Sequence, residues 1–303
     1  MAKKLGARSR PDTGLSSARL VSSYLFPRPK TRLALLLAAP VTWLVLIYIV
    51  ALVALLVTAF WSVDSFTGEI HMTWSLDNLN QVFTQALYRT VTFRTVGIAL
   101  LVTVIDLLVA LPIAFFMAKI AKARSQRIMV ILILMPLWAS YLVKAYAWRS
   151  VLSHDGILQW LLQPFGLGTP GYGLAGIVIT QAYIWLPYVI LPIFAGLERV
   201  SNTLLEASAD LGAKSLTTIR LVVAPLLLPA IIAASIFSFS LTLGDYITVN
   251  IVGGPNQMLG NLVYTNVGAA NNLPLASAIA LVPVAIMFAY LALVRKTGAL
   301  ENL

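Results

Sequence analysis

Four ionisable side chains lie within, or at the ends of, long apolar runs of this sequence: Asp106, Lys144, Arg149 and Asp245. Placing a charged side chain in the hydrocarbon core of a membrane costs about 2.5–3.5 kcal/mol on insertion scales, so such residues usually serve a function. The chemistry they offer is electrostatic: an ion pair between helices, or contact with a charged cargo. We expect Asp106 to pair with Lys144, while Lys144 and Arg149 could also extend toward the membrane surface.

Asp245 is the acid with the clearest chemical surroundings, because Tyr246 follows it directly. A carboxylate beside an aromatic ring suits a cationic amine, through charge and through cation–π attraction. The alternative is an interfacial acid that faces water beside a tyrosine of the aromatic belt. The aromatic-rich segment 136–148 is expected mostly to pack between helices, but some of its rings could line the same path. The predicted substrate pathway comprises Asp245, Tyr246, Trp138, Tyr141 and Tyr146.

Several kinds of catalytic chemistry are excluded by composition. The chain has no Cys and only two His, His71 and His154, so neither a metal cluster nor a Cys–His or Ser–His nucleophilic pair is expected. The stretch from Gly212 to Ser215 contains Lys-Ser but lacks the spacing of a phosphate-binding loop. We therefore expect no catalytic residue, no metal and no cofactor on this chain.

The composition points to a membrane protein. Of the 303 residues, 59% are hydrophobic and only 11% charged, and the mean hydropathy is +0.88. Soluble domains average about 25% charged residues, so this chain cannot cover a soluble surface. The net charge of +10 comes largely from basic residues gathered in 1–32 and 119–127. Because such loops are typical of the cytoplasmic side of a membrane protein, we expect no nucleic-acid partner.

Hydropathy and length predict an all-α, polytopic membrane protein with six transmembrane helices. The expected spans are Leu33–Trp61, Thr95–Ala118, Ile128–Leu152, Leu174–Leu197, Pro225–Ile247 and Leu275–Val294. The first span should be an uncleaved anchor, because the tail before it is long and rich in Pro. An even number of spans puts both termini on one side, and the basic loops place that side in the cytoplasm.

The domain organisation follows from these spans. Residues 1–32 should form a basic cytoplasmic tail, and residues 33–303 one transmembrane domain. The external segment 247–274 carries no charge, which is unusual for a solvated loop. We expect this segment to dip back toward the pore or to lie on the membrane.

The cytoplasmic loop at 198–225 carries its own pattern. Thr203 and Glu206 have the spacing of a capping box, which predicts a helix over 204–211 ended by Gly212 in a left-handed conformation. Ser215 should cap a second short helix that leads to Pro225. In the first helix, small residues share a face that would admit a partner closely. A membrane-surface helix is the alternative, but such helices are usually basic with bulky anchors.

This loop resembles the EAA loop of bacterial ABC-importer permeases, whose pattern is E-A-A-x3-G-x9-I-x-L-P. Glu206, Ala207, Gly212 and Pro225 match it, and the three departures conserve size or apolarity: Ser208, Val222 and Ala224. The resemblance implies a type I importer permease of the MetI-like fold in the bacterial inner membrane. It also implies an ATPase dimer that binds ATP and Mg, a second homologous permease and an extracytoplasmic binding protein. The residues implied to contact the ATPase are Glu206, Ala207, Ser208, Asp210 and Gly212.

A narrower resemblance suggests the cargo. The aromatic segment 136–148, Gly244-Asp245, Gly253-Gly254-Pro255 and the stretch 259–278 are similar to the first permease of spermidine/putrescine importers. Permeases for opines, phosphonates and iron share parts of these motifs, so the same role for another substrate is the alternative. A stand-alone secondary transporter would need relays of charge in the membrane and no specialised cytoplasmic loop, which counts against it.

Overall fold

The computed structural model describes residues 29–64 and 67–295 and divides into two units, Met1–Leu55 and Leu56–Leu303. The predicted basic tail over 1–32 lies almost entirely outside the described residues. The first unit is helical: α2 (Pro29–Leu44), a π-helical turn η1 (Val45–Ile49) and the start of α3 (Val50–Thr58) follow without a break. Their apolar stretch Leu36–Thr58 has 23 residues and a mean hydropathy of 2.7, which fits the first predicted span.

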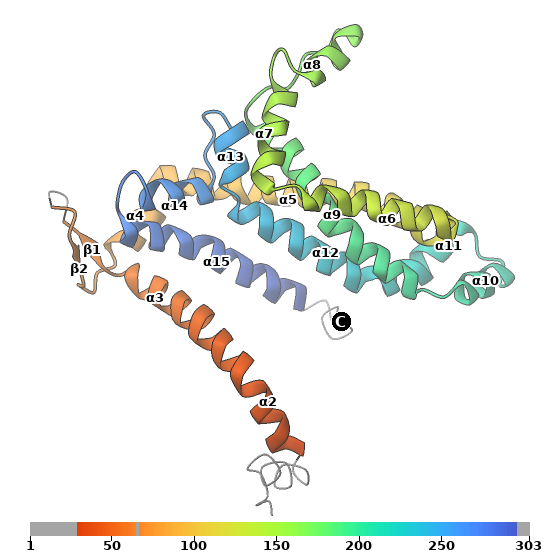
Figure 1. The fold of residues 1–303 in the computed structure, drawn as a ribbon, viewed down its shortest axis with the longest axis horizontal. Helices are drawn as coiled ribbons and strands as arrows, with labels where there is room; N and C mark the ends of the chain where they lie inside the picture. The colour runs from red at the N-terminus through yellow and green to blue at the C-terminus, as the bar shows by residue number, and fades with distance from the viewer. Residues whose placement is uncertain (1–28, 65–66, 296–303) are drawn as a thin grey trace, which may run out of the picture. The chain divides into compact units, whose positions relative to one another are not determined.

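The second unit is almost entirely helical (Figure 1). It begins with a short antiparallel hairpin, in which β1 (Ser62–Val63) pairs with β2 (Ile70–His71). The next elements along the chain are α4 (Asp77–Thr84), α5 (Ala86–Phe115), η2 (Phe116–Ile120), α6 (Ala123–Trp138), α7 (Tyr141–Leu152), α8 (Ile157–Leu162), η3 (Gln163–Phe165) and α9 (Leu174–Arg199). The remaining elements are α10 (Asn202–Asp210), α11 (Ser215–Thr218), η4 (Ile219–Val223), α12 (Ala224–Gly244), α13 (Ile247–Val252), α14 (Leu259–Val267) and α15 (Leu273–Arg295).

Three long helices, α5, α9 and α12, lie side by side and form the centre of this unit (Figure 1). Two buried clusters join α5 to α9; the one nearer the loop between α9 and α12 also includes α12. Small residues let α9 and α12 approach closely: a Cβ added at Gly196 would lie 2.5 Å from the Cβ of Ala230. Such close packing stabilises helix pairs in a bilayer, where burial of apolar side chains gives little advantage.

The third predicted span is not one straight helix. The stretch Ile128–Leu152 is divided between α6 and α7, which are bent by 94° at Ala139 and Ser140. The backbone is extended at Ala139, with ψ of 138°. Buried and half-buried residues of α7, including Ala145, Leu152 and Trp148, pack in the cluster shared with α9 and α13, which holds α7 across the bundle. The described residues thus contain five helices that could span a membrane, or six if the bent pair counts as one.

The uncharged segment 247–274 folds back onto the bundle. Its first part forms α13 and its second part forms α14, and both helices bury side chains such as Val249, Val252 and Leu262. Thr95 Oγ1 on α5 accepts a hydrogen bond from the backbone N–H of Leu259 at 3.0 Å. The lack of charge is therefore explained by packing, because these residues contact α5, α7, α9 and α15 and do not form a solvated loop.

Candidate functional site

The loop between α9 and α12 forms two short helices, as the sequence predicts. Gly212 follows α10 with φ of +79°, the expected left-handed conformation. The backbone N–H of Gly212 donates to Ala209 O at 2.8 Å, and that of Ala213 donates to Ser208 O at 3.1 Å. These bonds satisfy carbonyl groups that an α-helix leaves free at its C-terminus.

The predicted caps of both helices are wrong. Helix α10 begins at Asn202 with Ser201 at the N-cap, and Thr203 Oγ1 bonds Ser201 Oγ at 2.9 Å and caps no backbone group. The chain is already extended at Ser201, so the helix starts before the capping box could form. Lys214 precedes α11, and Ser215 is its first helical residue.

The exposed side chains of α10 form one outward surface. Glu206, Ala207 and Asp210 are exposed, and so is Leu211, with 89% of its surface accessible. Ser208 is buried, and its Oγ shares a hydrogen bond with Thr218 Oγ1 at 2.8 Å, which ties α10 to α11. Ser208 therefore shapes the loop from inside, and the surface open to a partner comprises Glu206, Ala207, Asp210 and Leu211. We call this set the α10 surface.

The basic segment 119–127 supports the base of the α10 surface. Lys119 Nζ donates to Val200 O at 2.5 Å, and Gln126 Nε2 donates to Glu198 Oε1 at 2.7 Å. The loop 119–127 thus lies against the end of α9. Both segments are predicted to be cytoplasmic, and the structure places them at the same end of the second unit.

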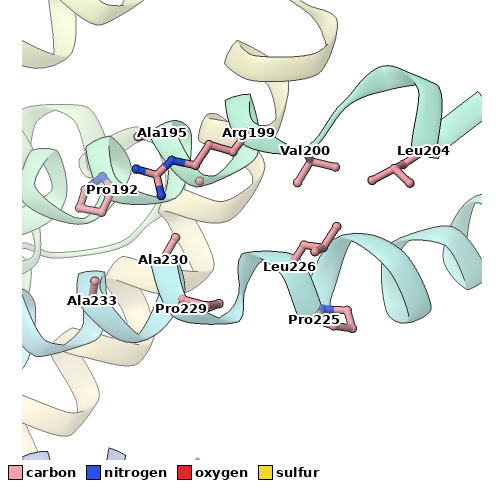
Figure 2. Close-up of a pocket in the computed structure, with 11 residues that line it drawn as sticks. Pro192, Ala195, Arg199, Val200, Leu204, Pro225, Leu226, Pro229, Ala230 and Ala233 are labelled. Atoms are coloured by element: carbon pink, nitrogen blue, oxygen red, sulfur yellow. The ribbon is translucent and has the colours of Figure 1, made fainter. Parts of the chain in front are cut away.

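A groove of about 630 Å³ lies where α9 leaves the bundle and α12 enters it. Figure 2 shows the Arg199 side chain extending along this groove toward Pro192 and Ala195, with Pro229 and Ala230 on the facing helix. The walls are mostly small or proline residues. The groove therefore lies between the base of this loop and the two helices that flank it.

A smaller groove of about 300 Å³ lies at the other end of α12. Its lining residues are Tyr141, Trp185, Ser240, Leu241, Gly244, Asp245, Tyr246 and Ile247, and we call it the outer groove. Tyr141 stacks on Trp185, with ring centroids 5.5 Å apart and planes 12° apart. Tyr246 stacks on Tyr264 at 4.9 Å.

The structure brings together three of the five predicted pathway residues: Asp245, Tyr246 and Tyr141. Trp138 is 82% exposed and Tyr146 is 55% exposed, and neither lines the outer groove. The bend between α6 and α7 separates Trp138 from Tyr141. Sequence reasoning missed Trp185, because nothing in the apolar run of α9 shows which face meets α7.

Asp245 is buried and held by two neutral donors. Gln181 Nε2 donates to Asp245 Oδ2 at 2.8 Å, and the backbone N–H of Thr248 donates to Oδ1 at 3.1 Å. Gln181 was also missed, although a glutamine inside a long apolar run is a visible signal. The Tyr141 and Thr248 hydroxyl groups are 2.5 Å apart, which joins α7 to the same network.

The predicted ion pair between Asp106 and Lys144 is wrong. Asp106 is fully buried on α5, and its Oδ2 accepts a hydrogen bond from Ser238 Oγ on α12 at 2.6 Å. Lys144 lies on α7, beyond the bend, and forms no ion pair within the described part of the chain. Arg149 on α7 donates to Ile251 O at 2.9 Å, so this side chain fixes α7 to α13.

Comparison with known proteins identifies the family. Residues 86–296 match the model described as "Binding-protein-dependent transport system inner membrane component". The chain is 40% identical to the "Inner membrane ABC transporter permease protein YdcU" of Escherichia coli (strain K12), over 99% of this chain and 98% of that protein. It is 29% identical to the "Spermidine/putrescine transport system permease protein PotB" of the same strain, over 74% of this chain and 82% of that one.

Solved structures agree on the fold. A chain of a bacterial ABC transporter for import of the acidic polysaccharide alginate superposes with a TM-score of 0.67, at 14% identity, over 91% of this chain and 99% of that chain. A second structure, in complex with an alginate pentasaccharide-bound periplasmic protein, gives a TM-score of 0.69 at 12% identity, over 89% and 95%. The chain therefore belongs to the binding-protein-dependent inner membrane components, the membrane-spanning permease subunits of ABC import systems.

Proposed function

We propose that this chain is the first permease of a pair that imports polyamines such as spermidine or putrescine. The observation that carries the proposal is Asp245, a buried acid in an aromatic groove. Among the residues described, no Lys, Arg or His side chain pairs with it. A buried charge is stable only when it is paired, and the ammonium group of a cargo would provide the missing partner.

The shape and chemistry of the outer groove favour an amine over the alternatives. Tyr141, Trp185 and Tyr246 offer ring faces, and such faces attract ammonium groups by about 0.5–2 kcal/mol. A phosphonate or another anion would meet the carboxylate of Asp245 and be repelled. This chain contributes one acid to the groove, so a second permease would supply the partner for the other ammonium groups of the cargo.

The α10 surface is the proposed contact with the ATPase. Its acids and small side chains would sit in a groove of an ATPase dimer, which binds ATP and Mg. Closure of that dimer would move α10, and α9 and α12 would follow because the loop is continuous with both. The pore would then open to alternate sides, while an extracytoplasmic binding protein delivers the cargo. This chain would perform no covalent chemistry.

The substrate assignment is tested on the whole complex. The importer is reconstituted in vesicles with its cognate binding protein, and uptake of labelled putrescine and spermidine is measured against a neutral sugar and an anionic phosphonate. The ligand that co-purifies with the binding protein is identified in parallel. ATP-dependent uptake of the amines alone is expected. Uptake confined to the sugar or the phosphonate would overturn the polyamine assignment and leave the family unaffected.

The aromatic wall makes a separate prediction. Replacing Tyr246 with Phe keeps the ring and should leave the rate of polyamine uptake within about twofold. Replacing it with Ala removes both the ring face and the stack on Tyr264, and should lower the rate about tenfold. Tyr146→Ala is the matched control, because Tyr146 lies outside the groove. Equal rates for Tyr246→Ala and the wild type would show that the ring does not contact the cargo.

The topology is tested with single cysteines, since the chain has none of its own. Both termini and the loop 119–127 are proposed to be cytoplasmic. A Cys at Ser125 should resist a membrane-impermeant thiol reagent in intact cells and react after lysis. A Cys at Thr67, in the exposed β1–β2 turn, should react in intact cells. The opposite labelling pattern would invert the proposed orientation.

A further inference from the structure

Gln181 is the side chain that connects Asp245 to the body of the bundle. It projects from α9 and is completely buried. Its Nε2 donates to Asp245 Oδ2 at 2.8 Å, whereas its Oε1 is buried without a hydrogen-bond partner. A buried amide oxygen without a hydrogen bond destabilises the fold. A glutamine at this position therefore destabilises the fold through its unpaired oxygen, which indicates that its N–H group serves a function.

This N–H group orients the Asp245 carboxylate. Asp245 is the first residue after α12, where the backbone leaves the helix with ψ of 121°. The backbone N–H of Thr248 holds one carboxylate oxygen from within the same turn, and Tyr141 on α7 contacts this turn through the Thr248 hydroxyl group and faces the carboxylate. Gln181 holds the other oxygen from a different helix. Together the two donors determine how the carboxylate meets the outer groove.

Gln181 does not line the outer groove itself. One turn further along α9, on the same face, Trp185 does line it and carries the stacked ring of Tyr141. One face of α9 thus supplies both an amide that orients the acid and a ring that forms the wall. The distance between charge and ring is set by this helix, and that distance determines how well an ammonium group can contact both.

We propose that Gln181 is a positioning residue for cargo selection, which holds the Asp245 carboxylate so that it binds one ammonium group of the amine against the aromatic wall. This inference rests on the proposed function and adds to it the residue through which α9 acts. Gln181 contacts no cargo, and its whole effect passes through Asp245. The expected signature is a loss of uptake that disappears once the Asp245 charge has been removed.

The test is a double-mutant cycle in the reconstituted complex, with putrescine as the probe. Gln181→Met keeps the length of the side chain and removes its N–H donor. It should lower the rate of ATP-dependent uptake about 5- to 10-fold, while complex yield and Tm change little, because the lost bond to Asp245 Oδ2 is offset by removal of the unpaired Oε1. Combined with Asp245→Asn, it should add less than about twofold to the loss caused by Asp245→Asn alone. Thr180→Val, at a fully buried neighbour on α9 whose hydroxyl is unpaired, is the control and should behave as wild type.

The outcomes separate this inference from the proposed function. If the wild-type complex transports no amine, the polyamine assignment fails and the role of Gln181 fails with it. If the wild type transports putrescine and Asp245→Asn impairs it, but Gln181→Met is unaffected, only the positioning role is overturned. The positioning role is also overturned if the losses of uptake caused by the two substitutions add in the double variant. It is overturned as well if Gln181→Met lowers complex yield and Tm, because Gln181 would then have a purely structural role.

Discussion

Asp245→Asn is expected to lower the rate of putrescine uptake by about 10- to 100-fold, with full assembly of the complex. Hydrogen bonds to charged groups contribute about 1.5–3 kcal/mol, and the substitution removes the charge but keeps the shape. The fold should tolerate the change, because Thr248 N–H can still donate to the remaining carbonyl oxygen. Gln181 can turn its amide so that Oε1, now unpaired, accepts from the new amide group. The measurement is uptake at saturating binding protein in reconstituted vesicles.

Two controls define this result. Asp155→Asn removes an exposed acid and should leave uptake unchanged. The affinity of the binding protein for putrescine should not change, because its site is on another chain. Wild-type uptake by the Asp245→Asn complex would contradict the role of this acid in the pathway. The assignment to the ABC permease family would stand, because it does not depend on Asp245.

The spans were predictable because length and hydropathy depend on local sequence. Five of the expected spans coincide, to within a few residues at their ends, with helices that are long and apolar enough to cross a membrane. The third is a bent pair of helices, and its bend at Ala139 and Ser140 could not be predicted because it depends on long-range packing. Half-buried Trp148 on α7 contacts Tyr183 on α9, with ring centroids 5.3 Å apart. No period within 128–152 reveals that contact, so the stretch looks like one continuous helix.

Among the candidate site residues, too, those set by local sequence could be predicted and those set by long-range packing could not. Gly212 was predictable because the left-handed conformation after a helix strongly favours glycine. Asp245 and Tyr246 were predictable because an acid and a ring are adjacent in sequence. Gln181 lies 64 residues from Asp245 along the chain, and only the packing of α9 on α12 brings them together. The ion pair expected for Asp106 failed for the same reason, since the bend before α7 directs Lys144 elsewhere and Ser238 on α12 bonds one oxygen of the buried carboxylate.

Gly212→Val is expected to separate ATP hydrolysis from uptake. A left-handed backbone costs a residue with a Cβ about 1–2 kcal/mol, and more for a β-branched side chain, so the turn after α10 should rearrange. The bonds from Gly212 and Ala213 to the end of α10 would be lost, and the α10 surface would shift with them. We expect at least a tenfold loss of ATP-dependent uptake with normal membrane insertion. ATPase activity and co-purification of the ATPase are measured on the same samples.

A matched substitution shows whether backbone conformation or close approach is the cause. Nothing lies within 4 Å of a Cβ added at Gly212, so within this chain a side chain at that position has space. Asn adopts the left-handed conformation more readily than other residues with a side chain, so Gly212→Asn should retain most of the uptake if conformation is the cause. If both variants are uncoupled, the ATPase approaches Gly212 too closely for any side chain. Normal uptake and coupling in Gly212→Val would instead contradict the assignment of this loop as the ATPase contact.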